Sequence, residues 1–384
     1  MNMEIDNAVT NYLQQQQREA PSELAHYFSE FEDLYERKIW HQLTKHVDTF
    51  INLPEAAAYR VSIYTEFVRD WQKHMNKVKL VLFALAAARQ FDSIPAASEF
   101  MIKISEEVNK PDSQEAYALA SLEGAHFRLL LNDLDSTRET LEKCEKMIQS
   151  FSHVEPVIYA SFYRVCADYY KAKAVFGQYY KNALLLLACI DIQELGTEDR
   201  VQRAYDLSIA ALLSDTIYNF GDLLSHPIIE SLRDTEHAWM LTLLLAFNSG
   251  DIGKFESLVS KLHGQPLLKQ QEPFLQQKIR LMALIESMFK RQGAGARAVS
   301  FGTISAETKL PAGEIEHLVM KALALGLIRG GIDQVEQVVT VQWVQPRYLG
   351  KGQIKDLVER LQQWEIRVKE TALKMSQTTP ELFA

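Results

Sequence analysis

The positions of the prolines constrain the fold of this chain most strongly. From the N-terminus to about residue 290, apolar residues recur three and four positions apart, as in Tyr64–Phe91, which is the period of an α-helix. Six prolines of this region fall at the edges of such segments: Pro54, Pro95, Pro111, Pro156, Pro227 and Pro273. Because proline is tolerated in the first turn of a helix and breaks its interior, each marks the start of a helix. The segments between them predict helices of roughly 12–20 residues, each long enough for an antiparallel pair.

Three junctions resemble one another and indicate a repeat. Each has a helix rich in Ala and Leu, a tight turn and a second amphipathic helix, with breaks predicted near Asn132, Gly177 and Gly250. Their spacings fit one and two units of roughly 37–45 residues, the period of helical-hairpin repeats. A single hairpin cannot bury its own apolar face, whereas stacked hairpins can. We therefore predict a mostly α-helical chain that begins as a right-handed helical-hairpin solenoid of the TPR type.

The pattern changes after residue 291. A short strand is predicted at Val299–Phe301, and Thr303 is a good N-cap for a short helix that follows it. Pro311 opens a second helix, which Gly326 ends. The apolar stripe of this second helix is Ile315, Leu318, Val319, Ala322 and Leu323.

Two strands complete this module. They are predicted at Leu327–Asp333 and Val338–Val344, and in the second Val339, Val341 and Trp343 alternate on one face, which predicts that they fill the module's core. With Phe274–Arg291 as the first helix, the order of helices and strands is that of a winged helix.

A long amphipathic helix is predicted at Ile354–Met375. Its apolar positions follow a heptad-like spacing of three and four: Ile354, Leu357, Leu361, Trp364, Val368 and Met375. An isolated helix of this kind must dock back on its own chain or join a bundle with partners. These six residues are the candidate interface of the C-terminal helix.

The sequence lacks the spaced motifs that form catalytic and metal-binding sites in known enzymes. The sequence contains no HExxH, HxH, GxSxG or GxxxxGK[ST] motif, and its three cysteines, Cys144, Cys166 and Cys189, are spaced too widely for a thiolate metal site. Gly293–Ala298 matches the GxGxxA dinucleotide fingerprint, but a helix precedes it and a strand follows it, so a flexible turn explains it better. His226, His237, His263 and His317 could meet only through the fold. We expect no enzymatic activity, metal or cofactor.

The charge of the chain disfavours nucleic acid as a ligand. The formal net charge is −9, and the segment from Arg297 to Gln345 contains four basic and five acidic residues. The helix that would enter a major groove begins with Glu314 and Glu316, which would face phosphate. The longest apolar run, Leu80–Ala88, is too short to cross a membrane, and the polar N-terminus has no signal-peptide core. An intracellular protein is expected.

Contact with another protein suits the winged helix better. A β-branched strand such as Val338–Val344 can extend a sheet across a subunit boundary if one of its edges is free. The alternative is that these residues only fill the module's own core. We name four residues as the candidate interface at the wing edge: Ile332, Val338, Thr340 and Gln342.

Three segments resemble the PCI family, whose module joins helical repeats to a winged helix. They are Leu243–Val259, Phe301–Val335 and the wing ending in Val338–Val344. The resemblance implies a solenoid over residues 1–225, the helical half of a PCI domain over 226–292, its winged-helix half over 293–345, and a C-terminal bundle helix and tail over 350–384.

PCI proteins occur in the proteasome lid, the COP9 signalosome and a translation initiation factor complex. Over its full length the chain looks like a subunit of the lid. This resemblance implies a non-catalytic scaffold for the degradation of ubiquitinated proteins, held in a hetero-oligomer by PCI contacts and by a shared helical bundle. It also implies a place in cytoplasm and nucleus, and it allows a ubiquitin-receptor or deubiquitinase subunit nearby. The alternative is a PCI scaffold of one of the two related complexes.

Overall fold

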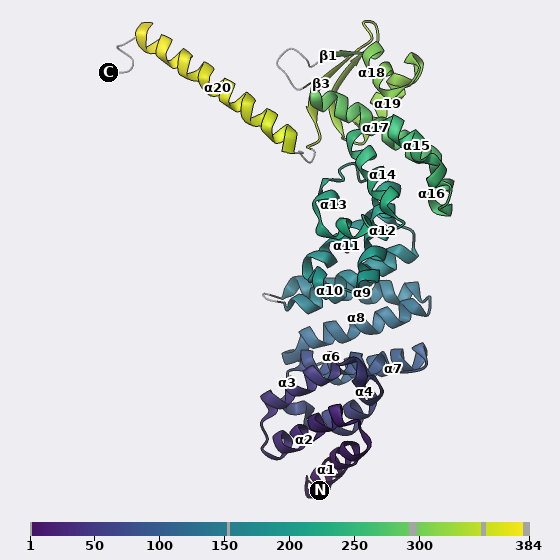
Figure 1. The fold of residues 1–384 in the computed structure, drawn as a ribbon, viewed down its shortest axis with the longest axis vertical. Coiled ribbons are helices and arrows are strands. Elements are labelled where there is room, and N and C mark those ends of the chain that lie inside the picture. Colours follow the sequence, from purple (N-terminus) through teal and green to yellow (C-terminus); the bar gives the residue numbers. More distant parts are fainter. Residues whose placement is uncertain (1, 152–153, 292–297, 347–350, 379–384) are drawn as a thin grey trace. The chain divides into compact units, whose positions relative to one another are not determined.

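A computed structural model describes residues 2–151, 154–291, 298–346 and 351–378 of the chain. It divides into two compact units, Met1–Asp191 and Ile192–Ala384, which we describe separately (Figure 1). None of the described helices is long and apolar enough to cross a membrane. The predicted turn over Gly293–Ala298 lies outside the described residues except for Ala298, and so does the tail over residues 379–384.

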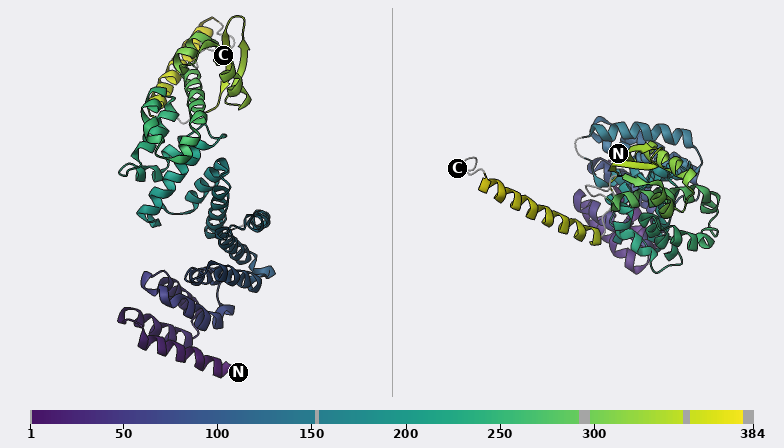
Figure 2. Two further views of the ribbon diagram at one scale, coloured as in Figure 1. Left: turned by 90° about the vertical axis from the view of Figure 1, so that its right-hand side faces the viewer. Right: turned by 90° about the horizontal axis from the view of Figure 1, so that it is seen from above.

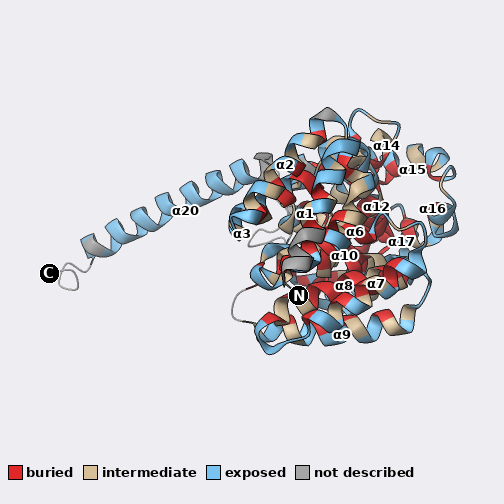
Figure 3. Ribbon diagram, turned by 90° about the horizontal axis from the view of Figure 1, so that it is seen from below, coloured by how far each residue is buried: buried red, intermediate tan, exposed pale blue. Residues whose placement is uncertain are grey.

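The first unit is an array of antiparallel helical hairpins (Figures 1 and 2). In the element names η marks a short 3-10 helix or, for η2, a π-helical stretch. The elements are α1 (Asn2–Glu19), α2 (Ser22–Glu36), α3 (Trp40–Ile51), η1 (Pro54–Tyr59), α4 (Arg60–Ser62), η2 (Ile63–Val68), α5 (Arg69–Trp71), η3 (Gln72–His74), α6 (Lys77–Ala88), α7 (Ile94–Val108), η4 (Pro111–Ser113), α8 (Gln114–Leu130), α9 (Leu134–Ser150), α10 (Pro156–Ala172) and α11 (Phe176–Cys189). Helix α8 packs on α6, α7, α9 and α10, so each hairpin covers the next. One hydrophobic cluster runs from Val9 to Tyr169, visible as red segments on α6, α8 and α10 (Figure 3).

The second unit joins further helices to a small sheet and a long terminal helix. Its elements are η5 (Ile192–Glu194), α12 (Thr197–Leu213), α13 (Gly221–Ser225), η6 (Pro227–Leu232), α14 (Ala238–Ser249), α15 (Ile252–Leu262), α16 (Pro266–Gln270), α17 (Glu272–Lys290), β1 (Ala298–Ser300), α18 (Phe301–Thr308), α19 (Ala312–Ala324), β2 (Ile328–Asp333), β3 (Val338–Val344) and α20 (Lys351–Thr378). The predicted fold class, helical hairpins followed by a winged helix and a C-terminal helix, is confirmed.

The prolines lie where the sequence predicts. All six stand at the first or second position of a helix, beginning η1, α7, η4, α10, η6 and α17. At these positions a missing N–H costs nothing, because the first N–H groups of a helix have no partner inside it.

Turns of one kind end helices in both units. After each of five helices comes one left-handed residue, and the N–H of the residue that follows donates to the carbonyl five residues before it, closing a Schellman turn. The left-handed residues are Lys38, Asn132, Ala174, Gly250 and Gly326, with φ between 53° and 69°. The breaks predicted near Asn132 and Gly250 are confirmed. The break predicted near Gly177 is wrong: the turn is at Ala174, and Gly177 lies inside α11.

Gly250 cannot be replaced without moving a neighbouring helix. A Cβ at this position would lie 2.6 Å from the Cα of Ala283 in α17, so α14 and α17 approach closely at this turn. The αL conformation and the close approach both favour glycine.

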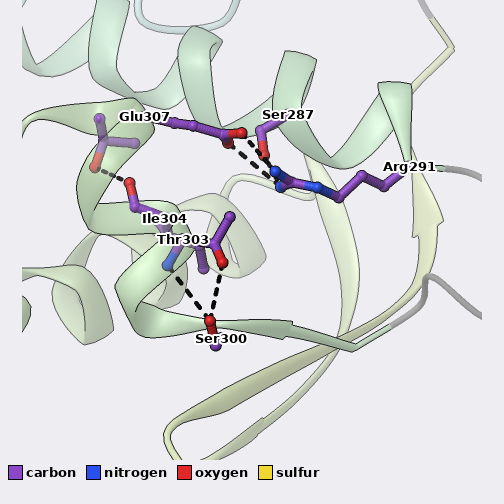
Figure 4. A network of polar contacts seen from close by, with 7 residues as sticks. Ser287, Arg291, Ser300, Thr303, Ile304 and Glu307 are labelled. Atoms are coloured by element: carbon purple, nitrogen blue, oxygen red, sulfur yellow. Dashed lines mark hydrogen bonds and ion pairs between the residues drawn. The ribbon is translucent and has the colours of Figure 1, made fainter.

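The winged helix is a three-stranded antiparallel sheet with strand order β1-β3-β2, covered by α17, α18 and α19. The N-cap of α18 is Ser300, whose Oγ accepts from the N–H of Thr303 at 3.4 Å, so the prediction of Thr303 as N-cap is wrong (Figure 4). Phe301 is accordingly helical, because β1 ends one residue earlier than predicted. Helix α19 buries Ile315, Leu318, Val319 and Ala322, leaves Leu323 half-buried and ends before Gly326.

Trp343 does not fill the core, contrary to the sequence prediction. Arg329 of β2 is opposite Trp343 in β3 while Gly330 is opposite Val341, so Gln342 is an extra residue that forms a β-bulge. A bulge changes the face on which the following residues point. Val339, Val341 and Val344 are therefore buried, whereas Trp343 is 37% exposed and its ring lies under the Arg329 guanidinium at 4.8 Å.

Candidate protein-interaction surfaces

Helix α20 presents apolar side chains along its described length. The six predicted interface residues are all exposed: Ile354 48%, Leu357 46%, Leu361 54%, Trp364 66%, Val368 48% and Met375 51%. The sequence analysis missed three more, Val358 46%, Ile366 56% and Leu373 62%. In Figure 3 the coloured part of this helix has the colour of exposed residues. Burying an apolar side chain of this size stabilises an assembly by about 1.5–3 kcal/mol, so this stripe is suited to a helical bundle.

The strands of the wing are arranged differently from the prediction. Because β3 lies between β1 and β2, the expectation of a free edge along Val338–Val344 is wrong over Val338–Thr340, where β1 occupies the second side. Ile332 lies on β2, which is an outer strand, and its side chain is half-buried. Val338 is half-buried, whereas Thr340 and the bulged Gln342 are exposed. β1 and β2 are both outer strands, and we take the outer edge of β2, the longer of the two, as the candidate for pairing.

Polar contacts join the winged helix to the helices before it. Arg291, directly after α17, donates to both carboxylate oxygens of Glu307 in α18, at 2.5 and 3.3 Å, and to Ser287 Oγ at 2.6 Å (Figure 4). Lys309 pairs with Glu256 of α15 at 2.8 Å, and Lys321 donates to Gln277 of α17 at 2.5 Å. These contacts join α18, α19 and the turn between them to α15, to α17 and to the residue that follows α17.

Lys278 is a buried cation that the sequence analysis missed. It is 1% exposed, and its Nζ donates to the carbonyls of Ala211 (2.8 Å), Leu212 (3.0 Å) and Ser214 (2.6 Å) at the end of α12. The rings of Tyr218, Phe220 and Phe274 surround it at 5.3–5.8 Å. Burial lowers its pKa to about 7, and Asp215 opposes this shift. An ammonium has three donors, one for each carbonyl, so Lys278 holds the end of α12 against α17. The available signal was a lysine in the apolar stripe of Leu275, Ile279 and Met282.

The cysteines and the four histidines named from the sequence were the other candidates for chemistry. Among the described residues no group of three or more His, Cys, Asp or Glu side chains could hold a metal ion. Burial raises the pKa of Cys144 and of Cys166 to about 12, which leaves both thiols protonated and unreactive. The four histidines of the second unit do not converge: His226 accepts from the N–H of Ile228, His237 contacts the ring of Tyr205, His263 pairs with Glu272, and His317 is exposed.

Comparison with known proteins is decisive for the family. Residues 27–244 match the family described as PSD13 N-terminal repeats, and residues 256–343 match the PCI domain. The chain is 41% identical over 372 residues to the probable 26S proteasome regulatory subunit rpn9 of Schizosaccharomyces pombe, covering 96% of each chain. The chain belongs to the family of 26S proteasome non-ATPase regulatory subunit 13.

Distant members of this family match over the same length. The 26S proteasome non-ATPase regulatory subunit 13 of Dictyostelium discoideum is 35% identical, over 97% of this chain and 98% of its own. The 26S proteasome regulatory subunit RPN9 of Saccharomyces cerevisiae is also 35% identical, over 97% of both. Subunit M of eukaryotic translation initiation factor 3 from Coccidioides immitis is 24% identical over 53% of this chain. The likeness to the subunit 13 family therefore spans hairpins, winged helix and α20 together.

Proposed function

We propose that this chain is a non-catalytic structural subunit of the lid of the 26S proteasome regulatory particle. The observation that carries the proposal is the match to relatives named as regulatory subunits of that complex, which covers 96–98% of this chain in four organisms. A scaffold that supports the degradation of ubiquitinated proteins needs contact surfaces and no reactive centre. The exposed stripe of α20 and the outer strand β2 supply such surfaces.

The proposed mechanism of assembly uses two surfaces. Other PCI-domain subunits contact the wing through Ile332 and the outer edge of β2, which replaces the edge of β3 predicted from the sequence. Thr340 and Gln342 of β3 are exposed beside this edge. The apolar stripe of α20 enters a helical bundle with partner helices. In this proposal residues 1–225 are the solenoid arm, 226–292 and 293–345 are the two halves of the PCI domain, and 350–384 are the bundle helix and tail.

The proposal places the chain in cytoplasm and nucleus, in a hetero-oligomer with a ubiquitin-receptor or deubiquitinase subunit nearby. The alternative, a scaffold of the COP9 signalosome or of the initiation factor, is less well supported, because the initiation factor relative matches only about half of the chain.

Native purification tests the proposal directly. The full chain carrying an affinity tag is isolated from its own cells under low salt, and the co-purified proteins are quantified by mass spectrometry. We expect proteasome subunits in amounts equal to that of the chain. Recovery with initiation factor or signalosome subunits in place of proteasome subunits would contradict the proposal.

A further inference from the structure

The face formed by the N-terminal half of α19 and the tip of the β2–β3 wing is acidic. Winged helices that read DNA use this pair of elements to contact it. These two elements carry four carboxylates: Glu314 and Glu316 on α19, and Asp333 and Glu336 on the wing. Three of them are exposed and Glu316 is half-buried. Such a face repels phosphate, so nucleic acid is excluded as its ligand.

The basic residues of the module are turned away from this face. Lys309 is paired with Glu256 of α15, and Lys321 is bonded to Gln277 of α17. The guanidinium of Arg329 covers the ring of Trp343, four residues from Asp333 along β2 and therefore about 13 Å from the tip. In the described part of the module, no lysine or arginine is placed to neutralise the four carboxylates.

An exposed apolar side chain stands at the tip of the wing. Val335 is 92% exposed, more than any other large apolar residue described. The turn that carries it is fixed: Asp333 Oδ1 accepts from the N–H groups of Val335 and Glu336, both at 3.1 Å. Gln334 donates to Glu316 at 3.1 Å and ties the tip to α19, while the carbonyl of Gln337 accepts from the N–H of Phe301 at 2.8 Å. A turn whose backbone is held in this way loses little entropy when it binds a partner.

We propose that this face docks on a protein surface that has a small apolar pocket rimmed by lysine and arginine. Val335 fills the pocket, and the carboxylates of Glu314, Glu316 and Glu336 meet the basic rim. Charge complementarity selects this occupant, since interfaces pair opposite potentials and place apolar anchors in central pockets. This contact is distinct from pairing along the edge of β2. The inference rests on the proposed function, because its partner is sought among the subunits of the proteasome.

A photo-crosslinking amino acid at position 335 of the full chain tests the inference in cells. We expect a crosslink to a protein segment that contains several lysines or arginines, with none from the same amino acid at Val157, an apolar residue of α10 that is 40% exposed. A crosslink to RNA, to an acidic segment or to nothing would overturn the inference.

A competition assay measures the contribution of the face. Each variant is expressed beside the wild-type chain, proteasomes are isolated through a tagged subunit of the core particle, and the ratio of the two chains is measured. We expect the ratio of variant to wild-type chain to fall about fivefold or more for Val335→Ser. The same fall is expected for the double variant Glu314→Lys with Glu316→Lys, because each change removes a central contact. The control variants are Val157→Ser, and Glu139→Lys with Glu145→Lys on exposed positions of α9.

The outcomes separate this inference from the proposed function. If the wild-type chain is incorporated and the face variants match their controls, the inference is wrong and the proposed function stands. If the wild-type chain is absent from proteasomes, the proposed function is wrong, and the crosslink from position 335 still decides the inference. Unchanged circular dichroism and melting of each purified variant show that its fold is intact.

Discussion

Two adjacent glycines of β2 differ in what surrounds them. A Cβ on Gly330 would lie 2.0 Å from the carbonyl oxygen of Thr340, whereas a Cβ on Gly331 would have nothing within 4 Å. Gly330 lies opposite Val341, next to the bulge at Gln342. We expect Gly330→Ala to lower the free energy of unfolding by about 1–3 kcal/mol, as overpacking does, and Gly331→Ala to change it little. Urea denaturation of both variants measures this, and equal losses would show that the close approach does not constrain the sequence.

The charge state of Lys278 should make stability depend on pH. Because burial holds its pKa near 7 in the folded chain, and the unfolded value is about 10.4, the unfolded chain binds one more proton between these two pH values. The free energy of unfolding therefore rises with pH across this window. Relative to Lys278→Met, the wild-type chain should gain roughly 1 kcal/mol per pH unit between pH 7.5 and 9.

Urea titrations at several pH values measure this gain. Lys181→Met, at an exposed position, controls for the loss of one positive charge. A difference between wild type and Lys278→Met that does not vary with pH would show that Lys278 stays protonated in the folded chain.

At the level of helices and strands, the sequence predicts an element well when its signal is local. The prolines and the turns at Asn132 and Gly250 were predictable because proline, asparagine and glycine have their own backbone preferences. The turn at Ala174 was not, because alanine has no such preference and costs about 1–2 kcal/mol in the left-handed region, which packing of α10 on α11 must offset. The bulge at Gln342 depends on how β3 pairs with β2, so simple alternation misplaced Trp343.

The candidate sites were also predictable where their signal lies within one element, and not where distant segments form them. The apolar stripe of α20 was predictable because its period lies within one helix, whereas the free edge of the sheet depends on strand order, which the sequence does not carry locally. Lys278 could be suspected as a lysine within an apolar stripe, but its three acceptors come from residues 64–67 positions earlier in the chain. Contacts between distant segments need the fold.

The stripe of α20 leads to a prediction for assembly. Trp364 is 66% exposed, so Trp364→Ala removes little from the fold of the isolated chain but takes a large apolar contact from a bundle. We expect weaker incorporation into the complex with an unchanged melting temperature of the purified chain. Glu370→Ala, at an exposed position about 120° around the helix from Trp364, is the control. Equal recovery of Trp364→Ala and wild type in a pull-down of the complex would remove Trp364 from the interface.

At the scale of the whole molecule, the hydrophobic cluster from Val9 to Tyr169 lies entirely within the first compact unit. A unit with a complete core of its own can fold without the rest of the chain. We therefore expect residues 1–191, expressed alone, to be helical and to unfold in one cooperative transition by calorimetry. Ending the fragment at residue 165 removes α11 and half of α10, and so uncovers α8. The shorter fragment should lose cooperative unfolding and bind a hydrophobic dye. A cooperative transition in the shorter fragment, or the absence of one in residues 1–191, would place the boundary of the folding unit elsewhere.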